Sequence, residues 1–239
     1  MIKKSRAILK EFRESARIIK SQNAELIWAN IFHDTIKDKD WLMGLSISPG
    51  RWAGGYSMLY IIVRVLTDYR PNKIIEFGLG ESSKIISAFI ENHLKSSIHD
   101  ILEQDENWIK IFNIKHSLSE RSDIKNFPLI QKEVNGFKVN SYSGIEKIIE
   151  KYDLYIVDGP FGSPRYSRFD IFRLTEKMEN NDEFIILIDD YNRPGEKDTV
   201  LELMNHFKKK NITVYTSIYA GEKAQFIIAT EKYRFITSA

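Results

Sequence analysis

The chain has 239 residues, which suits one large α/β domain with a small N-terminal addition, because a domain of this size buries most of its unfolded surface. Its 35 Lys and Arg side chains nearly balance 33 Asp and Glu, and this balance predicts no nucleic-acid partner. The absence of cysteine excludes disulfides, thiolate nucleophiles and Cys-ligated zinc. No apolar run is long enough to cross a bilayer and the N-terminus lacks the apolar stretch of a secretory signal, so we expect a cytoplasmic protein without a membrane span.

The first segment with a clear period runs from about residue 2 to residue 29. Apolar side chains recur there at helical spacing, with Lys and Arg on the other faces: Ile8, Phe12, Ala16, Ile19 and Ile27. This pattern predicts an amphipathic helix docked on its own domain or on a second subunit, which would make the protein a homo-oligomer. A helix lying on a membrane surface is the alternative, disfavoured because the apolar face lacks a large set of Trp, Phe and Leu side chains.

A loop rich in Gly and Pro follows, and then a helical run from 57 to 69 that stops before a proline. We therefore predict an N-terminal helical extension and cap loop over residues 1–56 and an α/β domain over residues 57–239. The cap loop should cover the ligand with three side chains, although a packed Trp is the alternative. These side chains are Arg51, Trp52 and Tyr56.

After residue 71, short apolar runs alternate with helical segments, which predicts a mostly parallel sheet with helices on both faces. The predicted strands are 73–77, 97–103, 136–140, 154–158, 184–189, 213–219 and 224–229. The last two are too close together for a helical crossover, so they should form an antiparallel hairpin at the sheet edge. The expected fold is a doubly wound, Rossmann-like α/β fold with a seven-stranded sheet and extra N-terminal helices. Residues 115–135 are expected to be an irregular insertion.

The first predicted strand ends in a glycine loop that opens directly into a helix. Gly78 and Gly80 permit a tight turn beneath a ligand, and the helix start supplies free N–H groups at the edge where open α/β sheets bind ligands. The loop lacks the Gly-Lys-Ser/Thr ending of a P-loop, and Ser83 takes the third glycine position of a dinucleotide fingerprint. A plain tight turn is the alternative interpretation.

Two carboxylates flank this loop. Glu103 ends the second strand, where a carboxylate can accept both hydrogen bonds of a ribose diol, while Asp105 suits the N-cap of the next helix. Glu76 places negative charge where NAD would bring a diphosphate, whereas S-adenosylmethionine brings an ammonium and a sulfonium. The charge favours S-adenosylmethionine as the cofactor.

With these motifs, the chain resembles the class I S-adenosylmethionine-dependent methyltransferases from about residue 71 to its end. Their first motif is acidic-x-Gly-x-Gly, their ribose acid ends the second strand, and their sheet finishes in an antiparallel hairpin. The resemblance implies a methyltransferase whose methyl donor is bound by one set of residues. These are Glu76, Gly78, Gly80, Ser82, Ser83, Glu103 and Asp158.

Three carboxylates should converge at the same sheet edge, because Asp158 follows the fourth strand and Asp189 and Asp190 follow the fifth. Clustered oxygen ligands suit Mg²⁺ or another divalent cation, which can lower the pKa of a substrate hydroxyl. The three also resemble the metal-binding positions of the catechol O-methyltransferase group, with Asp190 where that group has Asn. That group carries a lysine three residues after its first metal aspartate, and Phe161 stands there, so either the general base differs or no metal binds. Helix capping or loop ordering is the alternative for these aspartates.

The segment after Asp158 interleaves aromatic and basic residues, and similar residues follow the fifth strand. Arginine forks bind carboxylates and aromatic faces stack on sugars, so the pattern is typical of an acidic-saccharide site. The predicted substrate-binding residues are Arg165, Tyr166, Arg168 and Arg193. The Val-Asp-Gly-Pro and Asp-Asp-x-x-Arg-x-Gly-Glu sequences also resemble glycan methyltransferases, such as those acting on glucuronic acid in plant xylan. Arg168 could instead pair with Asp170 or another local acid at the surface.

The predicted function is methyl transfer to a hydroxyl of a sugar or glycan, with Asp158, Asp189 and Asp190 as catalytic residues. Its acceleration would come mainly from holding the acceptor oxygen, the methyl group and the sulfur collinear in a dry pocket. Two alternatives stay open. One is a nicotinamide-dependent oxidoreductase, which Ser83 and Glu76 disfavour. The other is a catalytically inactive donor-binding module that works through its N-terminal helix.

Overall fold

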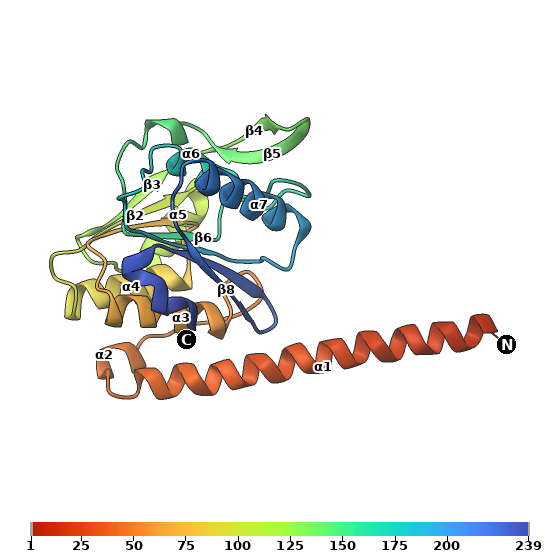
Figure 1. Cartoon of the computed structure of the whole chain (residues 1–239). Helices are drawn as coiled ribbons and strands as arrows, with labels where there is room; N and C mark the ends of the chain where they lie inside the picture. The colour runs from red at the N-terminus through yellow and green to blue at the C-terminus, as the bar shows by residue number, and fades with distance from the viewer. Residues whose placement is uncertain (1, 239) are drawn as a thin grey trace.

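The computed structural model describes residues 2–238. A long helix, α1 (Ile2–Ile36), runs along one side of an α/β body and extends well beyond it (Figure 1). The helix is longer than its predicted range because its last turns pack on the body through Phe32 and Ile36, which are both buried.

One seven-stranded sheet forms the centre of the body. Its strand order is β3-β2-β1-β6-β7-β9-β8. The strands are β3 (Ser122–Asn126), β2 (Ile98–Glu103), β1 (Lys73–Phe77), β6 (Leu154–Val157), β7 (Ile185–Ile188), β9 (Ala224–Ala229) and β8 (Tyr215–Ala220). The first five run parallel, and β9 is antiparallel to both of its neighbours. This sheet confirms the predicted Rossmann-like fold with its C-terminal hairpin.

Helices cover both faces of the sheet (Figure 1). Strand residues alternate between two cores, with Ile74 and Ile156 in one and Ile75 and Val157 in the other, as the two-residue period of a strand requires. The first core contains α2 (Asp40–Met43), α3 (Tyr56–Asp68), α4 (Glu81–Asn92) and η2 (Glu231–Ser238). The second contains η1 (Ile145–Lys147), α6 (Asp170–Thr175) and α7 (Pro194–Lys209). Near β3, α5 (Glu106–Lys115) contributes Phe112 to a small third cluster.

The third strand of the sheet lies elsewhere than predicted. Residues 136–140 belong to a separate hairpin of β4 (Leu129–Val134) and β5 (Phe137–Tyr142). The sheet edge is instead formed by β3, inside the segment predicted to be irregular. As an edge strand, β3 needs few apolar residues, and Ile124 is its only large one, so it has little apolar pattern.

The N-terminal helix docks on the body only near its C-terminal end. Residues 8–20 are exposed on every side, so the predicted docking on the chain's own domain is wrong for this part. Among the described residues, no helix is long and apolar enough to span a membrane.

Candidate functional site

Four parallel strands bring the predicted site residues to one edge of the sheet. The register pairs Phe77 with Leu102 and with Val157, and Val157 with Ile188, so β1, β2, β6 and β7 end at the same level. The loops after these strands carry the glycine motif and the acidic residues. This is the edge at which open α/β sheets bind their ligands.

The glycine loop packs tightly against the loop after β6. Gly78 has a φ of +100°, which disfavours any other residue, and a Cβ on it would lie 3.5 Å from the backbone of Asp158. Its N–H donates to the carbonyl of Leu102 at 2.8 Å. A Cβ on Gly80 would meet nothing within 4 Å, so packing does not require a glycine there. The turn at Gly78 therefore fixes how the two loops approach each other.

The carboxylate of Glu76 is fully buried beneath this loop. It accepts hydrogen bonds from the hydroxyls of Ser82 and Ser83, the second at 2.7 Å, and lies 3.1 Å from Nε2 of His99. Ser83 also accepts the N–H of Gly80 at 3.0 Å. Glu76 thus holds the first turn of α4 under the loop, while its predicted contact with the donor, and those of Ser82 and Ser83, stay predictions.

Glu103 joins the ends of β1 and β2. Its two oxygens accept the N–H groups of Leu79 at 2.9 Å and of Asp105 at 2.8 Å. Burial raises the pKa of Glu103, and these N–H groups lower it. The neighbouring Asp105 caps α5 by accepting the N–H groups of Asn107 and Trp108, which confirms its predicted role. Because Asp105 caps α5, Glu103 is not needed for that cap. Its carboxylate holds the glycine loop and remains available to a ligand that binds over this loop.

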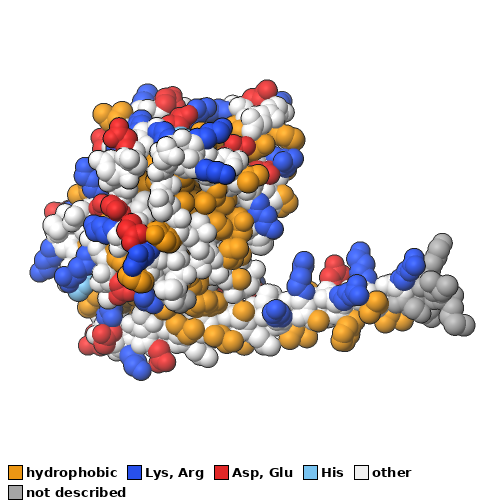
Figure 2. All heavy atoms as spheres, viewed as in Figure 1, with side chains coloured by type: hydrophobic (Ala, Val, Ile, Leu, Met, Phe, Trp, Pro, Cys, Tyr) orange, Lys and Arg blue, Asp and Glu red, His pale blue; other side chains and the backbone are white. Residues whose placement is uncertain are grey.

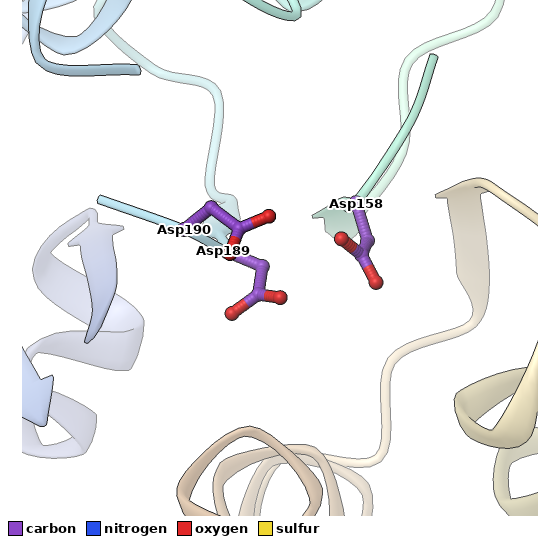
Figure 3. Close-up of side chains that lie close together, drawn as sticks. All are labelled: Asp158, Asp189 and Asp190. Atoms are coloured by element: carbon purple, nitrogen blue, oxygen red, sulfur yellow. The ribbon is translucent and has the colours of Figure 1, made fainter. Parts of the chain in front are cut away.

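The three predicted aspartates form one cluster at the ends of β6 and β7 (Figure 3). One oxygen from each of Asp158, Asp189 and Asp190 lies within 4.8 Å of the others. The side chain of Asp158 is 17% exposed, whereas those of the other two are at most 3% exposed. Asp158 is therefore the member that a substrate can reach.

A buried arginine lies behind this cluster. Arg168 places Nη2 at 3.0 Å from Asp158 and at 2.8 Å from Asp190, and its Nη1 donates to the carbonyl of Asp189 at 3.0 Å. Its side chain is only 5% exposed. The preceding residue, Ser167, holds this segment on α7, because its N–H donates to the carbonyl of Gly195. Arg168 thus binds the aspartates from the protein side.

A lysine that the sequence analysis did not single out reaches the cluster from the β8–β9 hairpin. Lys223 Nζ donates to Asp189 at 3.2 Å and to the carbonyl of Ala53 in the cap loop at 3.0 Å. The other oxygen of Asp189 accepts from Gln225 at 2.7 Å, and Gln225 in turn accepts the hydroxyl of Ser57. Both carboxylate oxygens of Asp189 therefore accept a hydrogen bond, one from Lys223 and one from Gln225.

The electrostatics of the cluster make Asp158 easier to protonate than an ordinary aspartate. Burial and the neighbouring Asp189 raise the pKa of Asp158 well above its ordinary range, against the opposing effects of Arg168 and Lys223. Burial lowers the pKa of Lys223, but the three aspartates together raise it. Lys223 is therefore a cation at neutral pH, while Asp158 has the raised pKa that suits a general base.

The three carboxylates match the ligand chemistry of Mg²⁺, but their surroundings do not fit the ion as they stand. Arg168 and Lys223 already place two positive charges against the three aspartates. One oxygen of Asp190 accepts from Arg168 and lies 2.9 Å from Nη1 of Arg193, and both oxygens of Asp189 are occupied. Within residues 2–238, Oδ1 of Asp190 has no hydrogen-bond partner, but Nζ of Lys223 lies 3.7 Å from it. A divalent cation would therefore have to displace Lys223, so we derive no catalytic step from a metal.

The three predicted substrate-binding arginines differ in how far they are exposed to solvent. Arg168 is buried in the cluster and faces no solvent, and Asp170, its suggested surface partner, instead binds Ser141 and the N–H of Tyr142. Arg165 and Arg193 have 43% and 49% exposed side chains, and Arg165 lies 4.7 Å above the ring of Phe137. The guanidinium groups of Arg165 and Arg193 are therefore accessible to an acceptor.

Other predicted residues lie around these arginines. The guanidinium of Arg165 donates to both oxygens of Asp198, and the ring of Tyr166 lies beneath it. In the cap loop, Trp52 is 90% exposed, so the alternative of a packed tryptophan is wrong.

Two functional residues could have been found from the predicted hairpin. Antiparallel pairing sets Phe226 opposite Ile188, which brings Gln225 and Lys223 to the aspartates after β7. Glu25 of α1 gave no such signal, because its partners are loop N–H groups far away in sequence. Its two oxygens accept the N–H of Tyr56 at 2.6 Å and that of Glu222 at 3.0 Å. Glu25 thus joins α1 to the cap loop and to the hairpin that carries Lys223.

No protein-family model matches the chain, and no curated protein matches its sequence. Solved structures share its fold. A precorrin-6y C5,15-methyltransferase from Geobacter metallireducens aligns with a TM-score of 0.50 and 13% identity over 81% of this chain and 96% of that chain. An O-methyltransferase from Bacillus cereus in complex with SAH gives a TM-score of 0.47 and 15% identity over 84% and 90% of the two chains. The SAH-bound methyltransferase PaMTH1 of Podospora anserina gives 0.42 and 12% over 93% and 95%.

At such identities the likeness concerns the fold alone. Together with the strand order, it shows that the chain has the class I methyltransferase fold, as the sequence motifs predicted.

Proposed function

We propose that the protein is an S-adenosylmethionine-dependent methyltransferase that methylates a hydroxyl of a sugar or glycan. The observation that carries the proposal is the contact between the two halves of the site. The turn at Gly78 packs on the backbone of Asp158, and Asp158 is the one partly exposed member of the acidic cluster. A donor over the glycine loop would therefore lie beside the carboxylate that receives the proton of the acceptor.

The chain's own residues divide the work of such a reaction. S-adenosylmethionine, when bound, supplies a methyl group on a sulfonium, and Glu103 with the turn at Gly78 would seat it. Asp158 accepts the proton of the acceptor hydroxyl, for which its raised pKa is suited. Arg168 and Lys223 keep the negative charge of the cluster in balance and hold Asp158 and Asp189 in place.

Charge and exposure support an acidic acceptor. Arg165 and Arg193 are half-exposed cations on the segments after β6 and β7, on the side of the site that carries the aspartates. A uronic acid would offer its carboxylate to the N–H groups that Arg165 and Arg193 do not already use on Asp198 and Asp190. The rings of Tyr166 and Phe137 near Arg165 suit the apolar face of a sugar.

The first experiment is a calorimetric titration of the full chain with S-adenosylhomocysteine, with NAD as a control and with each titration repeated in Mg²⁺ and in EDTA. We expect micromolar affinity for S-adenosylhomocysteine, no binding of NAD, and no effect of Mg²⁺. Dependence on Mg²⁺ would restore the metal hypothesis. Absence of binding under every condition would mean that the loop at Gly78 is only a turn.

The second experiment measures transfer of radiolabelled methyl to uronic-acid glycans and to their neutral, carboxyl-reduced forms. We expect labelling of the acidic form only, with loss of discrimination in Arg165→Gln and Arg193→Gln. Donor binding without labelling of any glycan fraction would favour the inactive donor-binding module instead.

A further inference from the structure

The described side chains in the N-terminal part of α1 lie open to solvent. All residues from 8 to 20 are exposed, and Figure 1 shows this part of the helix extending beyond the body. An isolated helix is marginally stable in water, because most helical stability comes from packing an amphipathic face. A surface outside the described chain is therefore needed to explain this segment.

An apolar stripe follows one face of the helix, on the side turned away from the body (Figure 2). Its members lie one, three, four or seven residues apart and share one face, since successive residues turn by about 100°. They are Ile8, Leu9, Phe12, Ala16, Ile19, Leu26 and Ile27. The large members of the stripe are between 49% and 70% exposed. Because Trp28 and Phe32 dock the opposite face, the body cannot cover the stripe.

A basic flank begins next to this stripe and continues onto the opposite face of the helix. It consists of Arg6, Lys10, Arg13, Arg17 and Lys20. Residues 1–20 contain seven Lys and Arg and two Glu, a charge of +5, whereas the remaining residues hold 28 basic and 31 acidic side chains, a charge of −3. The positive charge of the protein is therefore concentrated on the helix that carries the uncovered apolar stripe.

We propose that α1 is an interfacial anchor that lies on an anionic lipid bilayer. The small number of Trp, Phe and Leu side chains disfavours such a membrane-surface helix, and the uncovered stripe restores this alternative. The apolar stripe would enter the boundary between headgroups and acyl chains, and the basic flank would meet the acidic headgroups. The geometry permits this, because the body and the stripe lie on opposite sides of the helix (Figures 1 and 2). The proposal is independent of methyl transfer and requires no membrane-spanning segment.

A second copy of the chain is a weaker explanation for the stripe. Pairing two such helices through the stripe would leave most of the basic side chains, which point away from it, without a role in the contact. Asn23 and the small Ala16 also interrupt the stripe along its length. Adjacent members such as Ile8 and Leu9 make it about 100° wide, which is broader than the narrow seam of a coiled coil. The charge of the basic flank and the width of the apolar stripe therefore favour a flat anionic surface as the partner of α1.

The test is co-sedimentation of the full chain with phosphatidylcholine vesicles that contain or lack phosphatidylglycerol, at low and at high salt. We expect at least about tenfold stronger binding to the anionic vesicles, lost at high salt. Two neighbouring substitutions form a matched pair, because Ile19 lies in the stripe and Ile18 does not. Ile19→Ser should weaken binding about tenfold, and Ile18→Ser by no more than about twofold. Both residues are exposed, so folding should be unaffected.

Light scattering of the same variants without lipid completes the experiment. A monomer that binds anionic vesicles supports the proposal. Equal effects of Ile18→Ser and Ile19→Ser, or no binding to anionic vesicles, would overturn it. A dimer that Ile19→Ser dissociates, together with absent vesicle binding, would replace the lipid surface by a second copy of the chain.

Discussion

The two halves of the sheet edge differ in how their polar atoms are satisfied. On the side of β1 and β2, the carboxylates of Glu76 and Glu103 bind neighbouring hydroxyl and backbone N–H groups, and the unpaired buried atom among the described residues there is a neutral one, Oε1 of Gln104. On the side of β6 and β7, ion pairs dominate, and several buried atoms have no hydrogen-bond partner among the described residues. These atoms are Nε of Arg168, Oδ1 of Asp190 and both oxygens of Glu196.

This difference suggests two functions for the two halves. A preformed scaffold binds the same ligand in every cycle, as the donor half would, whereas unsatisfied buried groups are costly and cluster where a site must respond to its substrate. Substitutions that change the shape of the first half should therefore disturb its function most. In the second half, substitutions that change the charge should have the largest effects.

The largest effect is expected from removing the exposed carboxylate of the second half. Asp158→Asn keeps the shape of the side chain but cannot accept the acceptor proton, so turnover should fall by about 10²–10⁴-fold. The affinity for S-adenosylhomocysteine should stay within a few-fold in calorimetry. Asp123→Asn, on the exposed edge strand, is the control and should leave both unchanged. Unaltered turnover in Asp158→Asn would remove this residue from the mechanism.

A change of shape in the first half should act on donor binding. Gly78→Ala forces a side chain into a φ of +100°, which costs about 1–3 kcal/mol, and moves the loop against Asp158. We expect at least about tenfold weaker binding of S-adenosylhomocysteine. Gly136→Ala has a comparable φ of +81° in the β4–β5 hairpin, outside the glycine loop and with open space around it, so it should strain the fold without affecting the affinity for S-adenosylhomocysteine. Equal affinities of the two variants would contradict the role of the glycine loop.

The sequence predicted the first half better than the second. Glycines after a strand and an acid at the end of the next strand are local signals, and the structure has Gly78 and Glu103 next to each other at the sheet edge, where these signals placed them, while their contacts with a donor stay predictions. Arg168 and Lys223 acquire their roles through contacts across the fold, and no local pattern shows that an arginine will turn inward. Edge strand β3 was missed for a related reason, because a strand paired on one side needs little apolar sequence.

Lys223 provides a way to change the charge of the second half alone. Lys223→Met leaves Asp189 and Asp190 with less compensation, so the free energy of unfolding should fall by about 1–3 kcal/mol. Because Lys223 lowers the pKa of Asp158, its removal should raise that pKa further. Activity requires Asp158 without its proton, so the acidic limb of the pH–rate profile should move to higher pH. Lys223→Arg should restore the limb, and an unshifted profile would separate Lys223 from Asp158.

The smallest expected effect concerns Glu196, which tests whether the second half stores unfavourable charge. Glu196 is 1% exposed, its nearest cation is Nε of Arg168 at 3.8 Å, and burial raises its pKa above that of the unfolded chain. Its contribution to stability is therefore complete below the unfolded-state pKa and is lost as the pH rises through the folded-state pKa. Glu196→Gln abolishes this titration, so urea denaturation should show the variant gaining stability over the wild type between about pH 5 and about pH 8.

Glu202→Gln, on the same helix but partly exposed, is the matched control for that measurement and should change the free energy of unfolding equally at both pH values. If Glu196→Gln instead loses stability as the pH rises, the attraction between Glu196 and Arg168 outweighs the cost of burial. The second half would then be a balanced network like the first, and its unsatisfied atoms would no longer distinguish the two.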